Sequence, residues 1–375
     1  MMKKKLVVLY EENKNNPVST WSGIPYQLRE SLNEFFDVIF IDSCDTKLLN
    51  TIKVVSKRIE KKTVSNILKP FYEKKHKELI NKRLQSHKGI PVLEISENVD
   101  VDNDFYLYRD MSYACYPYVL DKFKDDRNNY GHGMLKHVSK DALKQRIINE
   151  EKLVNKSKGT FFMGQWAVDL LKDMYPNDKD KFIAVGGGLS KEFENLSINK
   201  TYNKKILFCG FDYLRKGGDL VEEAFKILKE KYDIDAELII AGPEINNHIE
   251  GVTYTGKINK KELSKYFNDC TVFCMPSRFE AYGLVFLEAQ CYGLPIVAID
   301  DYEMHHFVKD GENGYLVKNY DTEELAEALH KALNNKEMIN NVIKNAPSFQ
   351  KEHTWDVVAK KIANVINERS YSNGK

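Results

Sequence analysis

The sequence lacks several patterns that would assign the chain to a special class of protein. None of its six cysteines forms a C-x-x-C pair, and several stand in apolar runs. We therefore expect buried, reduced thiols rather than disulfides or a zinc site. No apolar stretch is long enough to span a bilayer, and the apolar run after the basic start MMKKK is too short for a signal peptide. These absences predict a cytoplasmic protein.

A strong charge of one sign is also missing. The 56 basic and 55 acidic residues give a formal net charge of +1, so composition offers no reason to expect nucleic acid as a partner. The content of 42% hydrophobic and 30% charged residues is typical of a globular protein. A length of 375 residues suits two α/β domains better than one.

Short apolar runs typical of strands alternate with helical patterns along most of the chain. This alternation predicts an α/β fold of two doubly wound, Rossmann-like domains, each with a parallel sheet, facing each other across a cleft. The glycine-rich and then polar stretch 186–205 is typical of a domain linker. We predict domains at 1–188 and 189–353, with a last helix in 354–375 whose apolar face could cover the first domain.

The segment CMPSRFEAYGLVFLEAQCYGLPIVAIDD, residues 274–301, is the most informative. It predicts a helix from Tyr282 to Tyr292 that is apolar nearly all round and is ended by Gly293. Glu288 stands in the middle of this helix, and a buried carboxylate is costly unless something bonds to it. Its partner is either a group within the fold or the vicinal hydroxyls of a ribose.

Glu280 lies eight positions earlier, where a loop should reach the carboxyl edge of a sheet. The backbone amides of Tyr282, Gly283 and Leu284 would then be free donors at a helix start and form an anion site. Arg215 and Lys216 precede another predicted helix, where cations oppose the helix dipole unless they hold an anion. Carboxylate, anion site and carboxylate together match the sugar, diphosphate and ribose of a nucleotide sugar.

At these residues the sequence resembles the family-4 glycosyltransferases of the GT-B fold. The resemblance rests on Glu280 and Glu288 within PSRFEAYGLVFLEAQCYGLPIVA, on Arg215-Lys216-Gly217 and on DGENGYLV from Asp310. It implies a metal-independent hexosyltransferase that retains anomeric configuration. In this reading the C-terminal domain binds the donor and the N-terminal domain binds the acceptor. Glu280, Arg215 and Lys216 are the implied catalytic residues, and Glu288 the implied ribose ligand.

The resemblance implies further binding residues. In the C-terminal domain these are Gly210 after the first strand and Lys257-Ile258 near the nucleobase, in addition to Tyr282, Gly283 and Leu284. Phe211 stands where many members have an arginine. In the N-terminal domain, Gly23 resembles the glycine loop of the family, and Arg109-Asp110 match an acceptor stretch of some relatives. We expect no cofactor and no metal, and a UDP-sugar rather than a GDP-sugar as co-substrate.

The expected acceptor is a glycan or lipid-linked glycan in cell-surface polysaccharide or glycoconjugate synthesis. Residues 52–89 contain twelve lysines and arginines but three acids. This segment is either a solvated helical face or a basic surface for an anionic membrane or a phosphate-bearing acceptor, which would make the protein peripheral to a membrane. The alternative functions are a nucleotide-sugar epimerase on the same scaffold and a non-catalytic nucleotide-sugar-binding subunit.

Two patterns resemble metal sites but carry other interpretations. Asp102-Asn103-Asp104 precedes a predicted strand instead of following one, so a polar turn is the better interpretation. His132 with His137, and His305 with His306, do not have the spacing of metal ligands on one helical face. The sequence therefore predicts no metal ligands.

Overall fold

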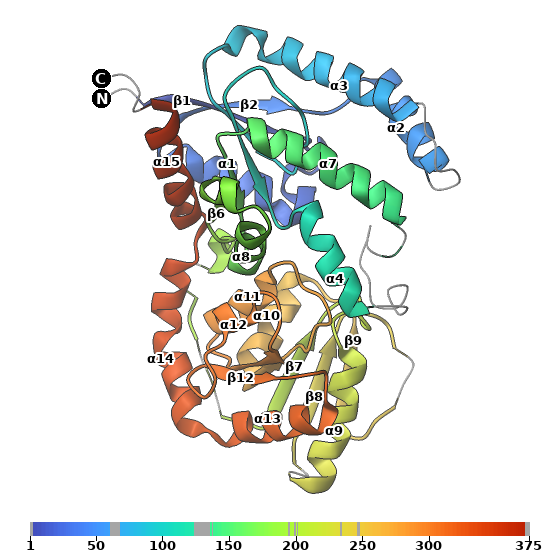
Figure 1. Ribbon diagram of the computed structural model, residues 1–375. Coiled ribbons are helices and arrows are strands. Elements are labelled where there is room, and N and C mark those ends of the chain that lie inside the picture. Colours follow the sequence, from blue (N-terminus) through green and yellow to red (C-terminus); the bar gives the residue numbers. More distant parts are fainter. Residues whose placement is uncertain are drawn as a thin grey trace. The chain divides into compact units, whose positions relative to one another are not determined.

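The computed structural model describes residues 3–60, 68–123, 136, 138–193, 196–198, 200, 202–232, 235–245 and 248–371, with the backbone alone at 57–60. His132 and His137 lie outside the described residues, as do parts of the basic segment and of the predicted linker. The chain divides into two compact units (Figure 1). The first comprises Met1–Tyr116, Val138–Gly188 and Trp355–Lys375, and the second comprises Pro117–His137 and Leu189–Thr354. Residues 117–137 thus group with the second unit, although the predicted first domain contained them.

The first unit is built on a six-stranded sheet, and every strand pair in it is parallel. The strand order is β2-β1-β3-β4-β5-β6. Residues Leu6 to Leu9 of the central strand β1 are completely buried, because helices cover both faces of the sheet. The strands are β1 (Lys5–Tyr10), β2 (Asp37–Asp42), β3 (Val92–Ile95), β4 (Phe105–Arg109), β5 (Gly159–Phe162) and β6 (Phe182–Ala184).

Most helices of the first unit connect these strands, and one comes from the C-terminal end of the chain. The last of them, α15 (Trp355–Tyr371), packs against α1 and buries Trp355, Val358, Ile362 and Ile366, the apolar face seen in the sequence. The Tyr106 hydroxyl lies 2.7 Å from Ser370 Oγ, which ties α15 to the sheet. The other helices are α1 (Ile24–Leu32), α2 (Lys47–Glu60), α3 (Leu68–Leu84), α7 (Lys140–Lys156) and α8 (Gln165–Met174), with short 3-10 turns at Pro17–Gly23, Gln85–His87, Tyr113–Cys115 and Pro176–Lys181.

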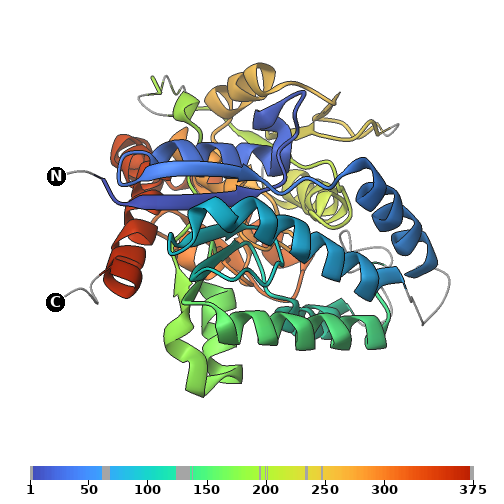
Figure 2. The same cartoon turned by 90° about the horizontal axis from the view of Figure 1, so that it is seen from above.

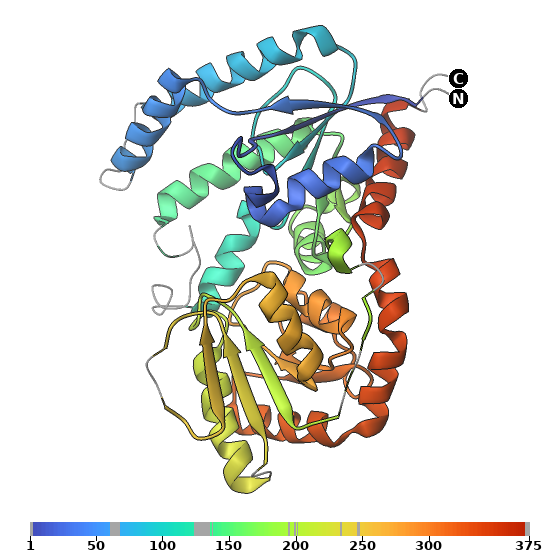
Figure 3. The same ribbon diagram turned by 180° about the vertical axis from the view of Figure 1, so that it is seen from behind.

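The second unit repeats the architecture. Its six parallel strands have the order β12-β11-β10-β7-β8-β9, and Figure 3 shows them from behind. The strands are β7 (Lys205–Cys209), β8 (Glu237–Ala241), β9 (Val252–Gly256), β10 (Val272–Cys274), β11 (Ile296–Ile299) and β12 (Gly314–Val317). The helices are α4 (Tyr116–Phe123, from Pro117 on), α9 (Gly218–Lys231), α10 (Lys260–Asp269), α11 (Leu284–Cys291), α12 (Met304–Phe307), α13 (Thr322–Asn334) and α14 (Lys336–Glu352), with a 3-10 turn at Lys191–Phe193.

The predicted fold class of two Rossmann-like α/β domains is confirmed by the two parallel sheets. All six cysteines lie in described residues and none of them forms a disulfide. Asp102-Asn103-Asp104 forms a polar turn before β4, where the Asn103 side chain donates to the carbonyls of His87 and Ile90. Among the described residues, no helix combines the length and apolar character needed to cross a membrane.

Candidate functional site

The carboxyl ends of β8, β7 and β10 lie side by side in the second sheet, and the predicted donor residues follow them. Backbones approach closely there. A Cβ on Gly242 would lie 2.3 Å from the carbonyl oxygen of Gly210, and a Cβ on Gly217 would lie 2.2 Å from that of Pro276. Both glycines also have positive φ, so larger residues are excluded by space and by backbone conformation. The loops after β7, β8 and β10 therefore form one packed edge.

Three of the predicted residues meet at this edge. The Lys216 ammonium donates to Glu280 Oε2, and the Arg215 guanidinium lies 3.6 Å from the same oxygen. Arg215 is nearly buried and is held by Asp212 Oδ2 at 2.9 Å and by the Phe279 carbonyl at 2.7 Å. Lys216 is the more adaptable cation, because its ammonium pairs with the carboxylate of Glu280, which a bound phosphate could replace.

Helix α11 begins at Leu284, two residues later than the sequence predicted. Gly283 has a φ of 92° and acts as the N-cap, which prevents Tyr282 from joining the helix. The Tyr282 side chain is buried against Phe307, with ring centroids 5.0 Å apart, so only its backbone is positioned for an anion. A Cβ on Gly283 would lie 3.0 Å from Glu280 Cγ, which places the N-terminus of α11 beside Glu280. The helix ends at Cys291, one residue before the predicted end, and Gly293 follows the C-cap Tyr292 with a φ of 73°.

Glu288 lies on α11 and is partly exposed. Within the part of the chain that the structure describes, no group makes a hydrogen bond or ion pair with its carboxylate, so a partner inside the fold is not found. Desolvation is the main reason that the pKa of Glu288 rises to about 7; Glu192 raises it further, while Lys260 and Lys216 oppose the rise. An uncompensated carboxylate of this kind is costly and is typical of binding and catalytic sites.

The Cys209 thiol lies at the end of β7, on the same edge. Burial is the main cause that raises the pKa of this thiol to about 12, and the charge of Glu288 adds to it. Lys257 and Ile258 follow β9, the edge strand next to β8, and Lys257 is exposed. Gly210 follows β7, and Lys257 and Ile258 follow β9. These residues therefore lie at the carboxyl edge of the sheet, the edge from which the loop with Glu280 and the helix with Glu288 begin.

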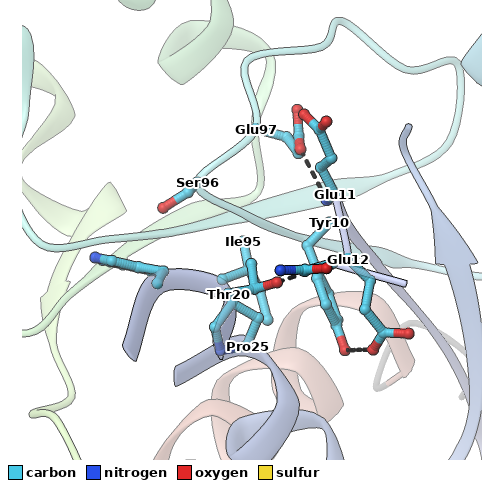
Figure 4. Close-up of a pocket in the computed structure, with 10 residues that line it drawn as sticks. Tyr10, Glu11, Glu12, Thr20, Pro25, Ile95, Ser96 and Glu97 are labelled. Atoms are coloured by element: carbon cyan, nitrogen blue, oxygen red, sulfur yellow. Dashed lines mark hydrogen bonds between the residues drawn. The ribbon is translucent and has the colours of Figure 1, made fainter. Parts of the chain in front are cut away.

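In the first unit, Gly23 is the left-handed N-cap of α1, with a φ of 84°. Its neighbours Trp21 and Pro25 line a pocket of about 480 Å³ at the carboxyl ends of β1 and β3. Three carboxylates also line this pocket (Figure 4): Glu11, Glu12 and Glu97. The Tyr10 hydroxyl donates to Glu12 at 2.8 Å, and the backbone amide of Glu11 donates to Glu97 at 3.1 Å.

Arg109 is the last residue of β4 and Asp110 follows it, but Arg109 does not line the pocket beside Gly23. Its guanidinium is buried and donates to Glu150 Oε1 at 2.5 Å, while Ser112 Oγ and the amide of Tyr113 donate to the other oxygen of Glu150. This network ties β4 to α7 and gives Arg109 a structural partner. The match of Arg109-Asp110 to an acceptor stretch stays a prediction.

Comparison with known proteins shows that most of the second unit is similar to glycosyl transferases. Residues 190–349 match the family model described as glycosyl transferases group 1. A relative is the phosphatidyl-myo-inositol mannosyltransferase of Mycobacterium leprae, which is 28% identical over 182 residues, or 46% of this chain and 48% of the relative. The chain spans about half the length of the curated relatives it matches first.

Solved structures extend the similarity of fold to both units. A glycosyltransferase from Rickettsia africae has a TM-score of 0.66 at 13% identity, with 99% of each chain covered. TarM of S. aureus, solved with UDP and other ligands, has a TM-score of 0.57 at 16% identity over 78% of this chain and 59% of TarM. At these identities the likeness shows the GT-B fold alone.

Sequence reasoning missed Arg278, although it stands in the group 1 segment two residues before Glu280. Its guanidinium makes two hydrogen bonds of 2.7 Å to the carboxylate oxygens of Asp219, the second residue of α9. The Arg278 amide also donates to the Arg215 carbonyl at 2.8 Å. Arg278 therefore fastens the loop that carries Glu280 to the loop that carries Arg215 and Lys216. The available signal was an arginine beside a predicted site residue.

Replacing Asp219 with asparagine should weaken the contact between Arg278 and the start of α9. Because asparagine removes the negative charge of Asp219 and one of its two hydrogen bonds to the buried Arg278, we expect unfolding stability to fall by about 1–2 kcal/mol and nucleotide affinity to fall as well. Thermal unfolding and nucleotide titration measure the two effects. The matched control is Glu327→Gln, which breaks an exposed ion pair on α13 and should change stability by no more than about 0.5 kcal/mol. Equal effects of both substitutions would contradict the role of Arg278.

Proposed function

We propose that the protein is a glycosyltransferase that moves a hexosyl residue from a nucleotide sugar to an acceptor hydroxyl with retention of anomeric configuration. The observation that carries the proposal is the partly exposed Glu288 carboxylate, which has no partner among the described residues. It lies on the helix whose N-terminus adjoins the Lys216–Glu280 pair. The match of residues 190–349 to group 1 glycosyl transferases supports the same conclusion.

Each group at the carboxyl edge of the second sheet has a role in binding the donor or in the reaction. Glu288 accepts hydrogen bonds from the two ribose hydroxyls, and the first-turn amides of α11 receive a phosphate. Lys216 leaves Glu280 for the diphosphate, and Glu280 then accepts a hydrogen bond from the sugar. As the bond between the anomeric carbon and the phosphate oxygen breaks, Lys216 and Arg215 stabilise the charge that grows on the diphosphate.

The acceptor oxygen forms the new bond to the anomeric carbon, and its proton passes to the departing diphosphate. The protein cations take the place that a divalent metal has in other transferases, so we propose a metal-independent reaction and no cofactor. We further propose a UDP-sugar donor, in line with the UDP bound by the similar TarM.

For the acceptor we propose the first unit, at the pocket beside Gly23 (Figure 4). Aromatic and carboxylate side chains such as Trp21, Glu11 and Glu97 suit the faces and hydroxyls of a sugar or polyol. The relative from Mycobacterium leprae is named for a lipid acceptor, which agrees with a lipid-linked glycan in cell-surface synthesis. We propose a cytoplasmic protein that can lie at a membrane surface.

A panel of nucleotide sugars in a thermal-shift assay tests the proposal. A donor at a hundred times its dissociation constant should stabilise the protein by about 2.7 kcal/mol, and UDP-sugars should exceed GDP-sugars. Incubation of the best donor without acceptor, followed by analysis of the sugar, separates a transferase from an epimerase. Turnover should persist in EDTA. If no nucleotide sugar raises the melting temperature, the proposed function is wrong.

A further inference from the structure

The first unit contains a second, larger pocket of about 770 Å³. It lies between α3 and α7, which run side by side in Figures 1 and 2, and the loop after β3 contributes to it. Residues at helical spacing supply its walls, including His76 and Lys77 from α3 and Arg146, Asn149 and Lys156 from α7. The two helices thus turn a polar side toward each other and leave a cavity between them, where packed helices normally bury apolar side chains.

The lining of this pocket is basic. It includes seven lysines and arginines against four aspartates and glutamates. Lys77 and Lys156 both donate to the same oxygen of Asp100, at 2.7 and 2.5 Å, so one carboxylate is shared by two ammonium groups. Lys74 and Lys152 also line the pocket and form no ion pair with any described residue. Lys53 of the lining pairs with Glu11 and Asp45, which lie outside it. Within the lining itself the cations exceed the anions, which favours an anionic ligand.

The basic pocket adjoins the smaller pocket beside Gly23. Ser96 and Glu97 line both of them, and Figure 4 shows these two residues at the end of β3. Ser96 has a φ of 58°, a left-handed conformation that is costly for a residue other than glycine and that occurs often at binding sites. Because two residues are common to both linings, a single ligand can occupy both pockets.

We propose, building on the function proposed above, that the acceptor carries a phosphate group, which binds between α3 and α7 while its hydroxyls lie in the adjoining pocket. Lysine ammonium groups act as adaptable point charges for phosphate oxygens. The hydroxyl-bearing part faces Glu11 and Glu12, which line the smaller pocket but not the basic one and would repel a phosphate. The charge difference between the two pockets fixes the direction in which the acceptor lies.

The test uses the full chain with saturating UDP, so that the cations of the second unit are already occupied. Glucose 6-phosphate is titrated against glucose in the wild type and in the double variant Lys74→Gln/Lys152→Gln. The control is Lys82→Gln/Lys144→Gln, which removes the same charge from exposed positions on the same two helices outside the pocket. We expect binding of glucose 6-phosphate but not of glucose, a loss of about fivefold in affinity in the first variant, and no loss in the control.

A second arm identifies the source of the phosphate. Vesicles of phosphatidylglycerol replace the sugar phosphate, with phosphatidylcholine vesicles for comparison. Binding to the anionic vesicles that only the pocket variant weakens would assign the phosphate to a lipid head group. Equal weakening by both double variants, or no phosphate-dependent binding in either arm, would overturn the inference. UDP binding, measured in the same samples, tests the proposed transferase separately.

Discussion

Replacing Lys216 with alanine should lower the rate of sugar transfer by about a hundredfold or more. The expected size follows from the loss of a positive charge that acts on the departing diphosphate, because comparable losses of one transition-state contact cost roughly 10²–10³ in rate. Release of UDP from the best donor of the thermal-shift panel is the measurement. Binding of UDP itself should weaken less than turnover, since the charge on the diphosphate is larger in the transition state than in the bound donor.

The matched control for this substitution is Lys226→Ala on the exposed side of α9, where the lysine is paired with Glu223. It removes a charge of the same sign from α9, the helix that follows the loop with Lys216, and should leave turnover unchanged. Glu280 keeps Arg215 at 3.6 Å in the Lys216 variant, so the fold should survive. Turnover close to that of the wild type would remove Lys216 from the catalytic group.

Replacing Glu288 with glutamine should weaken nucleotide binding and, in the same protein, increase stability at alkaline pH. The pKa of this carboxyl is raised to about 7 from 4.5, so the folded state holds its proton more tightly than the unfolded chain does. The wild type consequently loses stability as the pH rises from about 4.5 through 7. Glutamine carries no charge to desolvate, so above pH 7 the variant should be more stable than the wild type by about 1–2 kcal/mol.

The pH dependence of binding should have the opposite sign to that of stability. Ribose hydroxyls donate to an ionised carboxylate, so we expect nucleotide affinity of the wild type to increase from pH 6 to pH 8, beyond any increase in the variant. Denaturant unfolding and calorimetric titration over this range measure both. The control Glu223→Gln lies on the exposed surface of α9 and should match the wild type. If the Glu288 variant binds nucleotide as well as the wild type, the assignment of this residue to the ribose is wrong.

Much of the fold could be predicted because buried parallel strands are continuous apolar runs. The apolar runs within Lys205–Cys209 and Ile296–Ile299 predict strands, and the structure has β7 and β11 there. Strand β9 (Val252–Gly256) has no such apolar run, because it is an edge strand of partly exposed residues with threonines at two of its five positions. The start of α11 was placed too early because a helical pattern alone does not reveal that Gly283 has a positive φ.

The site was predictable where one segment carried the chemistry, and less so where distant segments meet. Glu280 and Glu288 stand in one stretch of sequence, but the charged groups around them differ, and these groups come from other parts of the chain. Glu280 is neutralised by Lys216 from the β7–α9 loop, whereas Glu288 meets no cation within hydrogen-bonding distance among the described residues. The hydrogen bonds of Arg278 to Asp219 join residues 59 positions apart, and no local sequence pattern predicts them. The pocket between α3 and α7 depends on tertiary packing in the same way.

The protonated state of Cys209 has a practical consequence for chemical labelling. A thiol with a pKa near 12 is almost entirely un-ionised at neutral pH, so iodoacetamide or maleimide will react with it slowly while β7 keeps its place in the sheet. Part of this low reactivity comes from the negative charge of the Glu288 carboxylate, which raises the pKa of the Cys209 thiol. Alkylation of Cys209, followed by mass spectrometry of its peptide, would therefore report local opening of this edge without any reporter group having to be engineered into the chain.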